Sequence, residues 1–94
     1  MNAKNFQAAL ARAGEPQSVV ALVGKHADAI VKEFNKKSKA GMDDIAALKA
    51  ALHEGLPKEN KRTADHLALR SALLLNLIAE EASGQKTTTP GAES

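Results

Sequence analysis

Apolar residues recur at helical spacing in a first short stretch, from about residue 3 to residue 13. Phe6 and Leu10 fall on one face of this stretch, and Asn2 precedes it as a capping residue. Gly14 supplies a stop, so the pattern predicts a helix of about three turns. A helix this short is marginally stable alone, and we expect it to dock on the rest of the chain through Phe6 and Leu10.

A second amphipathic stretch runs from about residue 18 to residue 37, with Ser18 as a candidate N-cap. Its apolar positions occupy one third of the helical wheel and are Val19, Val20, Val23, Ala27, Ile30, Val31 and Phe34. Gly24 lies at the border of this face, where it would either kink the helix or admit a neighbouring backbone. We favour a continuous helix that tolerates the glycine at a cost of about 1 kcal/mol relative to alanine.

A third helix is predicted to begin at Asp43 and Asp44, because negative charge is favoured in the first turn of a helix. Its narrow apolar seam consists of Ile45, Leu48 and Leu52. The helix ends in the sequence Gly55-Leu56-Pro57, where we expect Gly55 to adopt the left-handed conformation of a C-terminal cap.

The fourth stretch begins at Asn60 or Thr63 and runs to about Ser83, with Gly84 as its stop. Its main apolar face consists of Ala64, Leu67, Ala68, Leu74, Leu75, Ile78, Ala79 and Ala82. A second ridge on the far side consists of Leu69, Leu73 and Leu77, bordered by His66, Arg70, Asn76 and Glu80. A helix that is apolar on two sides must be covered on two sides. The other helices each offer one apolar face, so we expect another copy of the chain to cover the ridge.

The fold class that follows is all-α, a small bundle of about four helices, one short at the N-terminus and three longer. Alanine and leucine dominate the apolar residues, and tryptophan and tyrosine are absent, which favours helices over strands. We expect residues 1–84 to form a single helical domain. Residues 85–94 are polar, and we expect them to be a disordered tail.

Composition and charge narrow the classes of function. The chain has no cysteine, which excludes disulfides, thiolate zinc sites and cysteine nucleophiles. Its net charge of +2 is far below that of a dedicated nucleic-acid-binding protein. No apolar run approaches the roughly 20 residues that cross a bilayer, and the first residues lack the apolar core of a secretory signal. We therefore expect a cytoplasmic protein that does not enter a membrane.

The sequence contains no constellation that is typical of an enzyme. His26, His53 and His66 lie on three different predicted helices, without the spacing of a helical zinc site. The adjacent carboxylates Asp43-Asp44 and Glu80-Glu81 lie near helix ends and point in different directions, which does not suit general acid–base catalysis. No nucleophile elbow or glycine-rich phosphate loop is present. We predict a protein that is not an enzyme and uses no metal or cofactor.

Basic residues provide a candidate contact surface for an acidic partner protein. They are Lys25, Lys32, Lys36, Lys37, Lys39, Lys61 and Arg62. We expect their charge to steer such a partner toward the chain.

A nucleic-acid-associated regulator is the alternative function. Ala51 and Gly55 have the spacing of the alanine and the turn glycine in a helix-turn-helix, which would span residues 45–70. The motif is degenerate, because Glu54 and Lys61 stand where apolar residues should be buried.

The function we favour is a small non-catalytic regulator, of inhibitor or adaptor type, that binds a partner protein and self-associates through its last helix. The predicted interface consists of Leu69, Leu73, Asn76, Leu77 and Glu80. Asn76 among leucines resembles the buried polar residue that fixes partner geometry in helical assemblies at some cost in stability. We therefore expect a homodimer.

Overall fold

A computed structural model describes residues 1–84 of the chain, which form six α-helices and one short 3₁₀ turn. In chain order, the elements are α1 (Ala3–Arg12), α2 (Gln17–Lys25), α3 (Ala27–Lys39), α4 (Asp44–Gly55), η1 (Lys58–Asn60), α5 (Lys61–Ala68) and α6 (Ser71–Ser83). The all-α class is confirmed, and residues 1–84 contain no strand. The predicted disordered tail, residues 85–94, lies outside the described residues.

The count of about four helices is corrected to six, because two of the predicted long helices are each divided. The helix expected over residues 18–37 is α2 followed by α3, and His26 separates them with φ −115° and ψ 10°. The helix expected from residue 60 or 63 to residue 83 is α5 followed by α6. Leu69 and Arg70 separate these two helices, and Arg70 has φ −106° and ψ 16°.

Each division gives the second segment a main partner that the first segment lacks. α2 and α3 both contact α1, but α3 packs mainly on α4. α5 and α6 both contact α4, but α6 packs mainly on α1. The first division follows Gly24, whose low helix propensity weakens the end of α2. At the second division, Ser71 Oγ donates to the Ala68 carbonyl at 2.8 Å, and the Arg70 amide donates to the Leu67 carbonyl at 2.9 Å, a 3₁₀-type bond. Tertiary packing therefore overrides a helical pattern that is continuous in the sequence.

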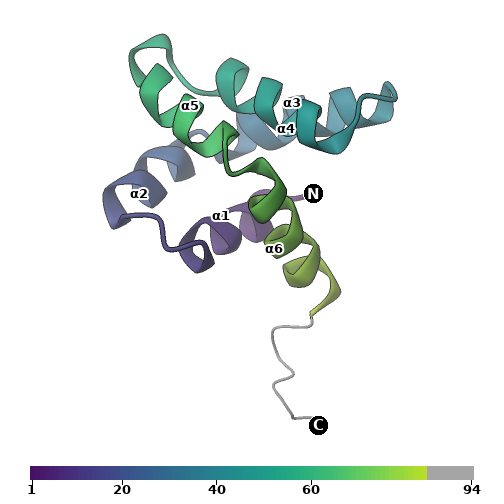
Figure 1. Cartoon of the computed structure of the whole chain (residues 1–94), viewed down its shortest axis with the longest axis horizontal. Coiled ribbons are helices and arrows are strands. Elements are labelled where there is room, and N and C mark those ends of the chain that lie inside the picture. The colour runs from purple at the N-terminus through teal and green to yellow at the C-terminus, as the bar shows by residue number, and fades with distance from the viewer. Residues whose placement is uncertain (85–94) are drawn as a thin grey trace, which may run out of the picture.

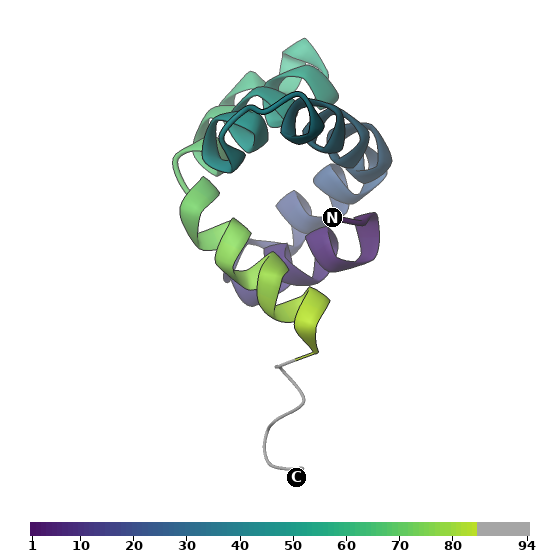
Figure 2. The ribbon, with the colours of Figure 1, turned by 90° about the vertical axis from the view of Figure 1, so that its right-hand side faces the viewer.

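The helices form two packed pairs. Figure 1 shows α3 and α4 side by side on one side of the molecule and α1 with α6 on the other. The perpendicular view in Figure 2 shows the helices surrounding a common interior, with α6 running away from α4 toward its C-terminal end. α2 connects α1 to α3, and α5 connects α4 to α6. In the turn between α5 and α6, Leu69 is exposed whereas Ser71 is buried.

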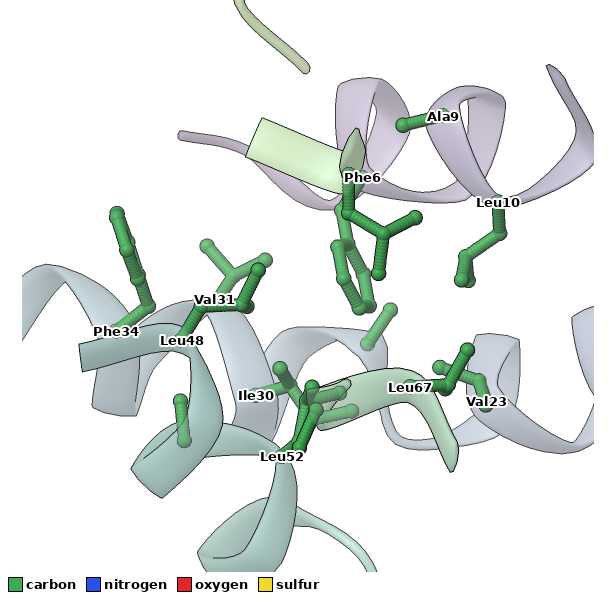
Figure 3. Packing of buried hydrophobic residues seen from close by; sticks show 14 of the residues in the cluster. Phe6, Ala9, Leu10, Val23, Ile30, Val31, Phe34, Leu48, Leu52 and Leu67 are labelled. Atoms are coloured by element: carbon green, nitrogen blue, oxygen red, sulfur yellow. The ribbon is translucent and has the colours of Figure 1, made fainter. Parts of the chain in front are cut away.

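The interior is filled by one cluster of apolar side chains. Phe6 points from α1 toward Ile30 of α3 and Leu52 of α4, as Figure 3 shows. The largest fully buried apolar side chains are Phe6, Leu10, Val23, Ile30, Leu48, Leu52, Leu67 and Leu74. The prediction that α1 docks through Phe6 and Leu10 is confirmed.

Gly55 is the last residue of α4 but does not adopt the predicted left-handed conformation, since it is not among the glycines with positive φ. A Cβ atom at Gly55 would lie 2.5 Å from Ile30 Cγ1 and 2.9 Å from Ile30 Cα. Glycine is therefore present to let α3 and α4 approach closely. The helix stops because Leu56 is extended, with φ −95° and ψ 147°, before Pro57.

The predicted helix ends at three other positions are confirmed. Asn2 caps α1, since its Oδ1 accepts a hydrogen bond from the Asn5 amide at 2.8 Å. α4 begins at the predicted Asp43-Asp44 pair, but Asp43 is the N-cap and only Asp44 lies in the first turn, since the Asp43 carboxylate accepts from the Ile45 amide at 3.1 Å. Gly84 ends α6 in the left-handed region with φ 77°.

Candidate functional site

The exposed leucines of the chain flank the turn from α5 to α6. Leu69 is 87% exposed and Leu73 is 40% exposed, whereas every other leucine within residues 1–84 is buried or half-buried. Asn76 is exposed on the same face of α6, three residues beyond Leu73. We call Leu69, Leu73 and Asn76 the leucine patch. Single exposed leucines are ordinary on protein surfaces, but neighbouring ones leave apolar area in water that a partner can cover.

The other predicted interface residues, Leu77 and Glu80, make contacts within the chain. Leu77 is half-buried and packs against the hydrophobic core. Glu80 Oε1 lies 2.7 Å from Arg12 Nη2, and Glu81 Oε2 lies 3.1 Å from Arg12 Nη1, which ties α6 to α1. These hydrogen bonds, chiefly the one to Glu80, raise the pKa of Arg12 against the opposing effect of burial. The exposed apolar surface is therefore smaller than the ridge predicted from the sequence.

The turn that carries Leu69 is held by a buried carboxylate from the other end of the chain. The Glu15 side chain, in the loop between α1 and α2, is only 1% exposed and accepts hydrogen bonds from Arg70 Nη1 and from His66 Nε2 at 3.0 Å. Arg70 Nη2 also donates to the Ala13 carbonyl at 3.1 Å, near the end of α1. The sequence pattern does not predict this cluster, because a glutamate between a glycine and a proline is typical of an exposed loop.

Lys37 differs from the other candidate basic contacts because it bridges α3 and α4. Its Nζ lies 3.0 Å from Glu54 Oε1 and 3.6 Å from Glu33 Oε1. The hydrogen bond to Glu54 raises the pKa of Lys37, and the same bond lowers the pKa of Glu54. A partner protein would have to compete with these carboxylates for the Lys37 ammonium group.

The remaining candidate basic residues are exposed but do not form one continuous surface. They are Lys25 at the end of α2, Lys32, Lys36 and Lys39 on α3, and Lys61 and Arg62 at the start of α5. The end of α3 and the start of α5 lie at opposite ends of α4 (Figure 1). Lys61 Nζ also lies 2.9 Å from Asp65 Oδ2, which offsets part of its charge. The predicted contact surface is therefore two separate basic regions.

The histidines have different partners and do not share a site. His53 Nε2 lies 2.7 Å from Asp65 Oδ1, whereas His66 contacts Glu15. His26 lies at the junction between α2 and α3. In the described part of the chain, no three side chains of the metal-binding types are grouped so that they could hold an ion.

The region of the degenerate helix-turn-helix, residues 45–70, forms most of α4 together with η1 and α5. α5 packs on α4 but has only 8 residues. Glu54 and Lys61 are both exposed, so neither position supplies the apolar contact that anchors a recognition helix. This geometry adds no support to the nucleic-acid alternative.

No family model, curated protein or solved structure matches the chain. None of the helices within residues 1–84 is long and apolar enough to span a lipid bilayer.

Proposed function

We propose that this chain is a non-catalytic protein-binding regulator that self-associates through the leucine patch. The observation that carries the proposal is the exposure of Leu69, at 87%, and of Leu73, at 40%, four positions apart in the sequence, whereas the other leucines of residues 1–84 are buried or half-buried. In the dimer, the leucine patch of each copy is buried against the leucine patch of the other. A two-fold interface brings the same surface of both copies together, and an apolar patch is complementary to itself. An acidic partner protein then binds elsewhere, guided by the two basic regions.

The size of the patch predicts weak association. Covering the patch removes roughly 200 Å² of apolar surface from each chain, or about 10 kcal/mol per dimer at about 25 cal/mol per Å². Loss of translational and rotational freedom opposes this by about 4–15 kcal/mol. At most about 6 kcal/mol remains, so we expect a dimer that forms at tens of micromolar to millimolar concentrations and exchanges quickly with the monomer.

The turn between α5 and α6 presents the patch in a fixed orientation. Arg70 lies between Leu69 and Ser71, and its guanidinium is anchored to Glu15 and to the Ala13 carbonyl. Fixing the turn before association lowers the entropy cost of binding. Asn76, at the edge of the patch, has an exposed amide group that can pair with its counterpart across a two-fold axis and set the register.

Sedimentation equilibrium over a wide concentration range tests this proposal. We expect the mass of the wild-type chain to rise from 9.9 kDa toward twice that value, and Leu73→Glu to remain at the monomer mass. Ile45→Glu is the matched control, because Ile45 is also 40% exposed but lies on α4. Circular dichroism checks that each variant is folded, and Leu69→Glu provides a second substitution in the patch.

The proposal is wrong if the wild-type mass stays near 9.9 kDa at millimolar concentration. It is also wrong if Ile45→Glu abolishes association while Leu73→Glu does not.

A further inference from the structure

A small surface pocket is lined by residues from the end of α4, from η1 and from the start of α5. These elements meet in the upper left of Figure 1. Its volume is about 260 Å³, and it is lined by His53, Pro57, Lys58, Lys61 and Ala64. Nearly all the accessible lining atoms are apolar, because lysine side chains contribute their methylene stems to such surfaces. The volume is below the roughly 300–1,000 Å³ of a drug-sized ligand site, so the pocket suits one ring or one branched side chain.

The charged groups of the lining give the rim of the pocket a positive excess. The Lys58 ammonium group forms no hydrogen bond or ion pair with another side chain within residues 1–84, although the Lys58 backbone carbonyl accepts from the Lys61 amide. Lys61 is paired with Asp65 at 2.9 Å. Within residues 1–84, Asp65 is the carboxylate that forms ion pairs with lining residues, and it offsets one of the two lysine charges. Glu54 and Glu59 adjoin the lining in the sequence but are exposed and lie outside it, and Glu54 is paired with Lys37.

His53 adds to this positive excess. Its Nδ1 lies 2.9 Å from the Lys49 carbonyl oxygen, and its Nε2 lies 2.7 Å from Asp65 Oδ1. Both ring nitrogens thus face oxygens that only accept hydrogen bonds, so both contacts are satisfied only by the doubly protonated imidazolium. The bond to Asp65, followed by the bond to the Lys49 carbonyl, raises the pKa of His53.

We propose that this pocket binds a compact apolar group that bears a carboxylate. The apolar group fills the space beside Pro57 and Ala64, and the carboxylate lies at the rim near the Lys58 ammonium group. A neutral apolar group would lack the ionic contact, and a larger anion would exceed the volume. A free organic acid and an acidic residue beside an apolar one in a partner peptide both present this chemistry.

Amide chemical-shift mapping on the ¹⁵N-labelled full chain tests the proposal with two matched pairs of probes. The first pair is phenylacetate and the neutral phenylacetamide. The second pair is the capped peptides acetyl-Glu-Leu-Glu-amide and acetyl-Gln-Leu-Gln-amide. We expect a saturable shift of the amides of His53, Lys58, Lys61 and Ala64 with at least one charged probe, and a weaker shift with its neutral counterpart. The pair that responds identifies the source of the ligand.

Substitutions separate a specific pocket from general attraction to a basic chain. Lys58→Gln removes a charge without breaking an ion pair in the described residues, and we expect it to weaken binding of the charged probe about two- to five-fold. Lys32→Gln on α3 is the matched control, because it removes the same charge from an exposed position outside the pocket. Leu73→Glu should leave probe binding unchanged, so the test is independent of self-association.

Three results would overturn the proposal. One is the absence of saturable shifts at the pocket with any charged probe. Another is equal binding of the charged and neutral members of each pair. The last is equal weakening by Lys58→Gln and Lys32→Gln.

Discussion

Gly55 lies directly against the backbone of Ile30, so the closest approach of α4 to α3 depends on the absence of a side chain. A Cβ atom there would lie 2.5 Å from Ile30 Cγ1 and 2.9 Å from Ile30 Cα. The second of these contacts is with backbone, which cannot move without displacing α3. Because α3 and α4 form one of the two packed pairs, this contact affects the whole core.

We expect Gly55→Ala to destabilise the protein by about 1–3 kcal/mol, because overpacking outweighs the gain in helix propensity. In a domain of this size, that lowers the melting temperature by roughly 4–8 °C for each kcal/mol. Gly24→Ala is the matched control. Its Cβ would meet only the end of the Gln7 side chain, at 3.3 Å, and we expect it to be neutral or stabilising by up to about 1 kcal/mol. Thermal unfolding of both variants measures the difference, and equal melting temperatures would contradict it.

The Arg70–Glu15 contact gives a second stability prediction. Arg70→Ala leaves the Glu15 carboxylate, which is 1% exposed, with His66 Nε2 as its remaining side-chain hydrogen-bond partner. We expect a loss of about 2–3 kcal/mol, less than for a fully buried pair because Arg70 itself is partly exposed. Arg62→Ala, an exposed arginine on α5, should change stability by less than about 0.5 kcal/mol. Urea unfolding of the two variants tests this, and a small loss for Arg70→Ala would show that water replaces the guanidinium.

The positions that sequence periodicity predicted well are those fixed by local helix geometry. Phe6 and Leu10 are fully buried, as expected, because an amphipathic helix directs such residues to one side whatever its partner is. Asn2 and Asp43 cap their helices for a similarly local reason. These features depend only on residues within one or two turns.

The divisions at His26 and Arg70 could not be predicted in the same way, because distant residues determine them. Arg70 is 55 positions from Glu15 in the sequence, and a continuous helix would hold its guanidinium on the same face as the leucine ridge. Once α6 takes a new direction, Leu77 packs against the core whereas Leu73 stays exposed. The extent of the leucine patch thus follows from tertiary contacts that periodicity does not encode.

The contacts of His53 make a prediction about pH. Hydrogen bonds to Asp65 and to the Lys49 carbonyl raise the pKa of His53 above its ordinary value of 6.5, although nearby Lys61 opposes the shift. A raised folded-state pKa means that this contribution to stability is full below pH 6.5 and is lost as the pH rises through the folded-state pKa. The His53 side chain is 40% exposed, so solvent screens the interaction and we expect a small effect on stability.

Asp65→Asn should lower the pKa of His53, because it removes the largest cause of the shift. An NMR titration of the His53 ring protons measures this change directly. Asp28→Asn on α3 is the control, since Asp28 is exposed and makes no contact with His53. An unchanged His53 titration in Asp65→Asn would mean that the ion pair does not form in solution.

We expect duplex DNA to show no salt-sensitive binding to this chain. Lys61 is paired with Asp65, and Glu54 and Glu59 are exposed carboxylates at the end of α4 and in η1. Phosphate contacts release counterions and therefore weaken steeply as salt increases. A mobility-shift assay at low ionic strength tests the expectation. A complex that weakens as salt increases, and that Arg62→Ala also weakens, would contradict this expectation and support the alternative that the chain is a nucleic-acid-associated regulator.

Asn76→Leu tests whether the leucine patch is the dimer interface or merely exposed surface. If Asn76 lies at a two-fold interface, its replacement by leucine extends the apolar surface and removes a polar group that would otherwise be desolvated. Association should then tighten by about ten-fold, equivalent to about 1.4 kcal/mol, while the dimer loses its single register. Sedimentation equilibrium measures the first effect, and doubling or broadening of the amide signals of α6 in NMR spectra reveals the second. Tighter association with sharp, single signals would show that Asn76 does not set the register, and unchanged association would place the interface elsewhere.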